Sequence, residues 1–257
     1  MFELKIEDKT NFKEFGYIKI DELSKNNLFS DYINEFKKDL KFAYDTQNIQ
    51  SLGGYKAGNL NINLGKYGPL ILNLLQSLNF KKYFNFITGD DISNFKVLYG
   101  GNLNLVNSKQ QLFHTDGKWN PRMIVFNIAS MDITSENGPI EIIESSHKFD
   151  LPYWKLLLNS SKLKKKKINL KKGEILIREH RLWHRGTTNK SKENREMLGI
   201  MFLKITEKNK LIEVKESKIK LYDNMFDTSL RGQFKEFIFV NLKFIIATYR
   251  LLISFLK

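Results

Sequence analysis

From Phe95 onward the chain is divided into short apolar segments, and this pattern constrains the fold more than any other feature. The segments cover residues 95–99, 102–106, 123–128, 140–143, 173–177 and 197–203, and clusters of Gly, Asn, Asp and Lys separate them. Brief strands between polar turns favour an antiparallel sandwich or barrel over alternating β and α units. We therefore expect a jelly roll as the core of the fold.

The residues before this region have a different period. Apolar residues recur every three or four positions from Leu28 to Leu40, and again from Leu70 to Phe84. This spacing is typical of amphipathic helices. We expect residues 21–90 to be mainly helical, which gives a mainly β protein with flanking helices and an N-terminal helical layer.

No Pro-, Gly- or Ser-rich linker interrupts the 257 residues, so the chain predicts one domain with terminal additions. We set the main domain at residues 1–210 and a C-terminal extension at residues 211–257. The absence of cysteine excludes disulfides and thiolate metal sites. Residues 1–9 are charged throughout and lack the apolar stretch of a signal peptide, so we expect a cytoplasmic protein.

Basic residues exceed acidic ones by 42 to 28, which gives a formal net charge of +14. Such an excess attracts anionic substrates, anionic lipids or nucleic acid. An AT-rich genome would also raise Lys, Asn and Ile together, without any such role. The lysine-rich run over residues 162–167 is most simply a solvated, mobile loop. We do not expect nucleic acid to be a partner.

The chain has four histidines, and two of them lie in patterns that suit a metal. His114 and Asp116 lie at a predicted strand end, where side chains two residues apart share a face. His184 ends a second predicted strand, which begins at Gly173. Two histidines and one carboxylate leave three positions of an octahedral metal open, which suits Fe(II) with a chelating co-substrate and oxygen. Zinc hydrolysis is the alternative.

Arg195 follows His184 by 195 − 184 = 11 residues, across a polar turn. A hairpin at this turn would return Arg195 to the side of the metal. Its guanidinium is a rigid two-pronged donor, which suits the far carboxylate of a dicarboxylate co-substrate. Thr187 could add a second hydrogen bond. The alternative for Arg195 is a surface charge on a strand.

Three spans of the sequence together resemble a known family. They are Phe113–Gly117, then Glu136–Pro139 with Ser146–Lys148, and then Gly173–Ile177 through Leu182–Gly186 to Arg195. In order and spacing they resemble the phytanoyl-CoA dioxygenase family, and the resemblance runs from residue 12 to residue 205. One departure is Glu144-Ser145, where many members have Pro-Gly. It affects a turn away from the metal-binding spans.

The resemblance implies a double-stranded β-helix, a cupin-like jelly roll, with Fe(II) as cofactor and 2-oxoglutarate and O2 as co-substrates. It implies that His114, Asp116 and His184 are the catalytic iron ligands and that Arg195 binds the far carboxylate of 2-oxoglutarate. Relatives that halogenate usually lack the carboxylate ligand, so Asp116 favours a hydroxylase. The family name does not fix the substrate, because one fold hosts many reactions.

Three residues close to these ligands in sequence are candidates for the substrate pocket, namely Trp119, His180 and Trp183. Both tryptophans could equally be packing residues. His180 and His184 have the i and i+4 spacing of a helical zinc pair, but the β pattern of this segment favours pocket lining or packing for His180. We expect His147, in the Ser-His span, to make a structural hydrogen bond and not to bind metal.

Residues 237–256 form an apolar run that polar residues interrupt too often for a transmembrane span. At about 100° per residue the polar side of this run is one stripe, made of Glu236, Lys243, Ala247, Arg250, Ser254 and Lys257. We expect one amphipathic helix there. It could dock on the core, pair with a second copy, or lie at the inner face of a membrane, and the sequence leaves all three open.

Together these patterns predict an Fe(II)- and 2-oxoglutarate-dependent dioxygenase that hydroxylates an unactivated C–H bond. The basic charge and the tail favour an anionic substrate, or a lipid- or carrier-linked one, while small metabolites stay open. The alternative is a non-catalytic membrane- or nucleic-acid-binding protein on an oxygenase scaffold. The intact ligand set and Arg195 argue against it.

Overall fold

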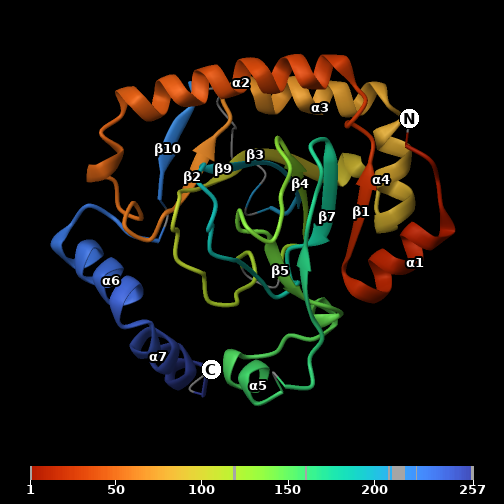
Figure 1. Ribbon diagram of the computed structural model, residues 1–257. Coiled ribbons are helices and arrows are strands. Elements are labelled where there is room, and N and C mark those ends of the chain that lie inside the picture. The colour runs from red at the N-terminus through yellow and green to blue at the C-terminus, as the bar shows by residue number, and fades with distance from the viewer. Residues whose placement is uncertain are drawn as a thin grey trace.

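The computed structural model describes residues 2–117, 120–159, 161–207, 209, 218–223 and 225–255. Its strands are β1 (Tyr17–Asp21), β2 (Asn59–Asn63), β3 (Phe95–Asn104), β4 (Met123–Ala129), β5 (Ile140–Ile143), β6 (Lys165–Ile168), β7 (Glu174–Glu179), β8 (His184–Gly186), β9 (Arg195–Lys204) and β10 (Lys220–Tyr222). They form a large sheet in the order β1-β7-β4-β9-β3-β2-β10 and a small sheet in the order β6-β5-β8 (Figure 1). All pairings between these strands are antiparallel, which confirms the predicted jelly roll.

The helices are α1 (Ile6–Phe15), α2 (Asn27–Thr46), α3 (Tyr67–Ser77), α4 (Phe80–Thr88), α5 (Tyr153–Leu158), α6 (Leu230–Asn241) and α7 (Lys243–Phe255). α2 begins at Asn26, whose side chain accepts a hydrogen bond from the Phe29 N–H and so caps the helix. α3 and α4 are separate helices because Asn79, between them, has a left-handed φ of 67°. The predicted N-terminal helical layer is present.

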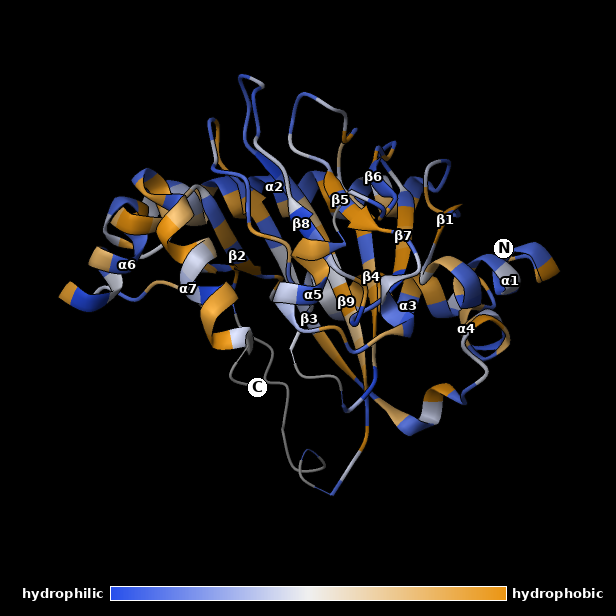
Figure 2. Ribbon diagram, turned by 90° about the horizontal axis from the view of Figure 1, so that it is seen from below, coloured by the Kyte–Doolittle hydropathy of each residue, from blue (hydrophilic) through white to orange (hydrophobic). Residues whose placement is uncertain are grey.

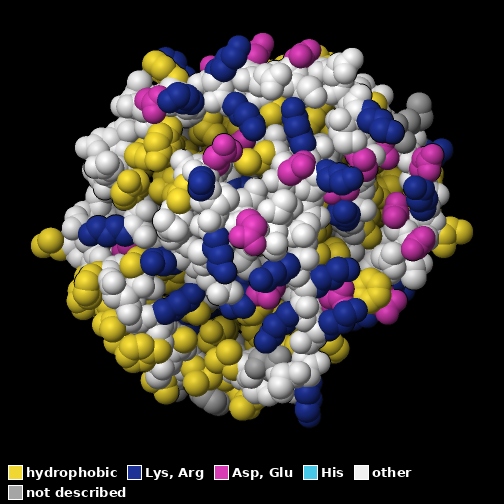
Figure 3. Space-filling model, viewed as in Figure 1, with side chains coloured by type: hydrophobic (Ala, Val, Ile, Leu, Met, Phe, Trp, Pro, Cys, Tyr) yellow, Lys and Arg dark blue, Asp and Glu magenta, His cyan; other side chains and the backbone are white. Residues whose placement is uncertain are grey.

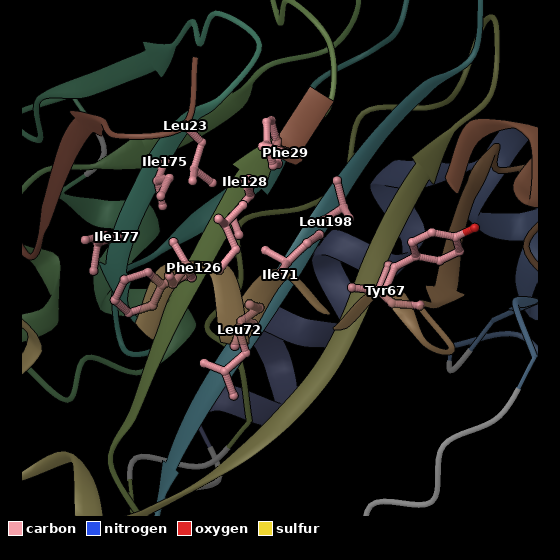
Figure 4. Close-up of a cluster of buried hydrophobic side chains, with 14 of the residues drawn as sticks. Leu23, Phe29, Tyr67, Ile71, Leu72, Phe126, Ile128, Ile175, Ile177 and Leu198 are labelled. Atoms are coloured by element: carbon pink, nitrogen blue, oxygen red, sulfur yellow. The ribbon is translucent and has the colours of Figure 1, made fainter. Parts of the chain in front are cut away.

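The main core lies between these helices and one face of the large sheet. Alternate residues of β4 face the helices, and Phe126 and Ile128 lie there beside Ile71 of α3 (Figure 4). The opposite face of the large sheet packs against the small sheet through a second cluster that includes Leu176 and Ile142. The central strands are accordingly mostly apolar along their length (Figure 2). The interior between the two sheets is where the candidate site lies.

Three sequence predictions need correction in this core. Residues 59–63 form a strand within the region predicted to be helical, because Leu60 and Ile62 alternate with asparagines and are buried against the helices. Residues 165–167 of the lysine run form, together with Ile168, the edge strand β6, which pairs with β5. Lysines on an edge strand keep it soluble and unpaired with other chains. The predicted segment at 95–99 and the start of that at 102–106 form one continuous strand, β3, which ends at Asn104.

The C-terminal run also differs from its prediction, because it forms two helices and not one. α6 ends at Asn241 and α7 begins at Lys243, and their axes meet at 107°. No single helix among the described residues meets the length and apolarity needed to cross a membrane, while α6 and α7 together pass that test as a bent pair. The predicted domain boundary at 210 lies outside the described residues. β10, from the predicted extension, pairs with β2 in the large sheet.

Candidate metal centre

The structure brings His114, Asp116 and His184 together inside the barrel. One nitrogen of each histidine and one oxygen of the carboxylate all lie within 4.8 Å of one another. Asp116 Oδ1 is 3.4 Å from His184 Nε2 and 4.0 Å from His114 Nε2. Two ligands that each bind one ion at about 2.1 Å are separated by up to roughly 4.2 Å, so these atoms fit around a common metal.

Main-chain pairing explains why residues far apart in sequence meet here. His114 and His184 form an antiparallel bridge, with two N–H to carbonyl hydrogen bonds of 2.9 Å between them. The Asp116 N–H donates to the His180 carbonyl at 2.9 Å. The strand predicted to run from Gly173 to His184 is in fact two strands. The chain leaves the large sheet after Glu179 and enters the small sheet at His184, which carries the ligand across the barrel.

Both imidazole rings are oriented by their own backbone. Nδ1 of His114 lies 2.9 Å from the Leu112 carbonyl, and Nδ1 of His184 lies 2.8 Å from the Leu182 carbonyl. A carbonyl can only accept, so each Nδ1 carries a proton and each Nε2 is left as the metal-binding nitrogen. Burial, together with the nearby His184 ring, lowers the pKa of His114 to about 4, so His114 is neutral at pH 7.

Arg178 is a residue of the site that the sequence patterns did not single out. Its Nη2 lies 2.7 Å from Asp116 Oδ2, and its Nε donates to Asn127 Oδ1 at 3.0 Å. Burial alone would raise the pKa of Asp116, but the Arg178 charge, with the neighbouring His184 ring, outweighs it and holds that pKa well below its usual value. The arginine binds one carboxylate oxygen and leaves the other facing the histidines. A charged residue inside the buried β7 run was the available signal.

Arg195 lies at the start of β9 with its side chain inside the barrel and only 2% exposed. Its Nη2 donates to the Gly138 carbonyl at 2.8 Å, while Nε and Nη1 are buried with no hydrogen-bond partner among the described residues. Burial lowers the pKa of Arg195 to about 10, although the adjacent Glu196 acts against this. A buried guanidinium with two unused donors is costly unless an anion binds it. This arrangement fits the carboxylate of a bound dicarboxylate.

Two residues near Arg195 shape this end of the barrel. Gly138 has a left-handed φ of +83°, and a Cβ on it would lie 2.8 Å from the Thr187 carbonyl oxygen, so only glycine suits this position. The Thr187 hydroxyl donates to the Pro139 carbonyl at 2.7 Å. Its single proton is used there, so Thr187 has no donor left for a co-substrate carboxylate in this structure.

A pocket of about 690 Å³ opens beside Asp116, and His180 and Met123 are among the residues that line it. His180 Nδ1 lies 2.9 Å from both the main-chain nitrogen and the carbonyl oxygen of Met123. The Trp183 ring lies elsewhere, in a cluster with Tyr153 and Leu156, because neighbouring residues of an extended strand point to opposite faces. Trp183 is therefore a packing residue. Trp119, the other predicted pocket residue, lies outside the described residues.

The remaining histidine and the departure from the family pattern lie away from the metal centre. His147 Nε2 is 3.2 Å from the Lys13 carbonyl, and His147 is not one of the residues grouped at the metal centre. Ser145, which replaces the usual glycine, has a left-handed φ of 61°. Glu144 accepts hydrogen bonds from Tyr17 at 2.7 Å and pairs with Lys164 at 2.9 Å. The turn thus keeps a glycine-like backbone conformation despite the substitution.

Comparisons with known proteins agree with this geometry. A profile of the phytanoyl-CoA dioxygenase (PhyH) family matches residues 70–197, a span that contains the three candidate ligands and Arg195. The chain belongs to this family, as the sequence patterns indicated. No curated protein matches the chain by sequence.

Solved structures share the fold at low sequence identity. SnoK, a non-heme alpha ketoglutarate dependent carbocyclase from nogalamycin biosynthesis, is 13% identical with a TM-score of 0.65 over 86% of this chain and 97% of that chain. EctD from S. alaskensis with bound Fe is 14% identical with a TM-score of 0.58, over 77% and 76%. EvdO2 from Micromonospora carbonacea var. aurantiaca, complexed with 2-oxoglutarate, is 13% identical with a TM-score of 0.56, over 79% and 92%.

Proposed function

We propose that the protein is an Fe(II)- and 2-oxoglutarate-dependent oxygenase that hydroxylates an unactivated C–H bond of a small or lipid- or carrier-linked substrate. The observation that carries the proposal is Arg195, a buried guanidinium with two unused donors in the same barrel as the candidate ligands. A hydrolytic zinc site would use the same three ligands. It would not explain a buried arginine whose Nε and Nη1 have no partner among the described residues.

Neighbouring residues connect Arg195 to the candidate ligands. Thr187 follows His184 by three residues, and its hydroxyl contacts the carbonyl of Pro139, next to the glycine that binds Arg195. A dicarboxylate co-substrate with one carboxylate at the metal would place the other at Arg195. The pairing at Arg195 would be charge-assisted, because the guanidinium keeps N–H donors at Nε and Nη1 that no described residue uses.

Bound iron with 2-oxoglutarate and O2 supplies the oxidising chemistry, with decarboxylation of the co-substrate to succinate and carbon dioxide. The residues of this chain supply placement. His114, His184 and Asp116 would hold the metal, and Arg178 fixes which oxygen of Asp116 faces it. The substrate would enter the pocket beside Asp116, where His180 lines the wall. The presence of Asp116 favours hydroxylation over halogenation.

The test is an anaerobic titration of the apoprotein with Fe(II) and then 2-oxoglutarate, followed through the weak visible charge-transfer band of the chelate. We expect the band in the wild type, its loss in His184→Ala, and its appearance only at much higher 2-oxoglutarate in Arg195→Ala. His147→Ala is the matched control, because this histidine lies away from the metal centre. It should behave like the wild type.

Turnover provides a second readout that needs no known substrate. Air-exposed, iron-loaded protein should slowly convert 2-oxoglutarate to succinate, and His184→Ala should abolish this conversion. Metal binding without the band, or succinate formation that survives His184→Ala, would contradict the proposal. No metal binding at all would favour the non-catalytic alternative.

A further inference from the structure

The helices α6 and α7 contact the rest of the protein through a side that is part polar and part apolar, on which Phe239 of α6 is buried beside Phe226 and Ala57. An amphipathic helix on a soluble protein normally buries its apolar stripe and exposes its polar one. Here the polar stripe predicted from the sequence faces inward together with Phe239, while six other large apolar side chains face outward. No described part of the protein covers this outward apolar side.

Specific polar contacts hold the inward stripe in place. Glu236 is 4% exposed and its Oε1 accepts a hydrogen bond from the Ala57 N–H at 2.9 Å. The Lys243 ammonium donates to the Gln110 carbonyl. Arg250 lies over the Tyr153 ring at 4.5 Å, and Ser254 Oγ accepts from the Trp154 N–H at 3.0 Å. Rotating either helix to bury its exposed apolar residues would break these contacts.

The outward side carries six large apolar residues, each between 51% and 86% exposed. They are Leu230, Phe234 and Phe237 on α6, and Phe244, Tyr249 and Leu252 on α7. We call this surface the tail face. On α6 these residues follow each other at four and three positions, so they share one side of the helix. Figure 3 shows apolar side chains gathered at the lower left, over α6 and α7, with basic side chains along the border.

The charges on these two helices distinguish between the partners that could cover the tail face. Arg231 and Lys235 are exposed, and the one acidic residue of α6 and α7, Glu236, is buried. In a two-fold dimer the same face meets itself, so these cations would face a surface whose helices offer no exposed carboxylate. An anionic bilayer offers both an apolar layer for the phenylalanines and negative headgroups for the cations.

We propose that the tail face binds the surface of a bilayer containing anionic lipids, with α6 and α7 lying in the interface and the barrel held at the membrane surface. The polar contacts to Ala57, Gln110 and Trp154 orient the two helices so that the tail face points away from the core. The aromatic residues of the tail face would insert at the level of the headgroups. This proposal does not depend on the oxygenase chemistry.

The experiment is co-sedimentation of the full-length protein with vesicles of phosphatidylcholine alone and of phosphatidylcholine with phosphatidylglycerol. The test variant is the double substitution Phe234→Ser with Phe244→Ser. The matched control is Phe42→Ser, because Phe42 is 69% exposed on α2, outside the tail face. A third variant, Arg231→Gln with Lys235→Gln, tests the charges. Thermal unfolding of each variant checks that it is folded, and light scattering gives its oligomeric state.

We expect binding to the phosphatidylglycerol vesicles that weakens with salt, and much weaker binding to phosphatidylcholine alone. The double phenylalanine variant should bind at least roughly tenfold more weakly, and Phe42→Ser should match the wild type. The charge variant should lose the preference for the anionic lipid. Absence of vesicle binding, or binding that the phenylalanine substitutions leave unchanged in a folded protein, would overturn the proposal. So would a wild-type dimer that those substitutions convert to monomers.

Discussion

Replacing Arg195 with methionine should have opposite effects on the free protein and on its complex with 2-oxoglutarate. In the free protein Arg195 is 2% exposed, makes one hydrogen bond to Gly138 and leaves Nε and Nη1 without partners. Methionine fills similar space without a charge. Exchanging a buried, poorly paired ion for an apolar residue is often neutral or stabilising by about 1–4 kcal/mol. The lost hydrogen bond costs about 1.5–3 kcal/mol, so the net change in unfolding free energy should be close to zero.

The bound state should lose much more. Two charge-assisted hydrogen bonds to the co-substrate carboxylate contribute about 1.5–3 kcal/mol each, which together is about 3–6 kcal/mol. Since about 1.4 kcal/mol is a tenfold change in affinity, 2-oxoglutarate should bind Arg195→Met about 100- to 10,000-fold more weakly. Metal binding should persist, because the candidate ligands do not contact Arg195.

Thermal unfolding in the presence of Mn(II) separates the two effects without oxidation. At a 2-oxoglutarate concentration near 100 times its Kd, the wild type should gain about 2.7 kcal/mol, or about 5–10 °C in Tm. Arg195→Met should keep the Tm of the free protein and gain almost nothing from the co-substrate. Arg231→Met, an exposed arginine on α6, is the control and should respond like the wild type. A variant that loses more than about 3 kcal/mol when free, yet keeps the full 2-oxoglutarate shift, would refute this reasoning.

Two further predictions concern the metal ligands. Arg178→Leu should weaken Mn(II) binding about 10- to 100-fold, because Asp116 Oδ2 loses its 2.7 Å partner and the carboxylate is no longer oriented; calorimetric titration measures this, and an unchanged affinity would contradict it. The pKa of His114 falls from 6.5 to about 4 on folding, so the unfolded chain binds more protons between these values. The metal-free protein should therefore lose stability as pH falls from about 6.5 to 4, seen as lower urea midpoints, and His114→Gln should flatten the profile. A profile that is flat in the wild type would argue against the buried, neutral ring.

The sequence predicted the parts of the fold that have a clear period. The strands at 123–128, 140–143 and 197–203 were predicted from short apolar runs, and each is present within a residue or two of its bounds. The strand at 59–63 was missed because its Asn-Leu-Asn-Ile-Asn alternation is only five residues long and lies between two helical patterns. The bend between α6 and α7 could not be predicted, because the apolar period continues across Leu242 without a proline or glycine.

In the candidate site, contacts within one short segment could be predicted from the sequence, and contacts between distant segments could not. The pairing of His114 with Asp116 could be predicted, since it rests on two residues within one short segment. The contact between Asp116 and Arg178 depends on how β7 lies across the barrel, and no local pattern gives that placement. The sequence also could not show which side of α6 and α7 faces the core. Periodicity shows that a helix has two sides, but it does not show which side the core will bind.

Charge balance inside the barrel links the metal to the co-substrate. The site has two positive charges, on Arg178 and Arg195, and one negative charge, on Asp116, so it carries one excess positive charge. A divalent metal alone would raise this excess to three. The dianion of 2-oxoglutarate cancels the metal charge, so each should strengthen the binding of the other. Linkage requires the two effects to be equal. The factor by which 2-oxoglutarate lowers the Kd of Mn(II) should therefore match the factor by which Mn(II) lowers the Kd of 2-oxoglutarate. If Mn(II) binds equally well with and without 2-oxoglutarate, the co-substrate does not share the barrel with the metal.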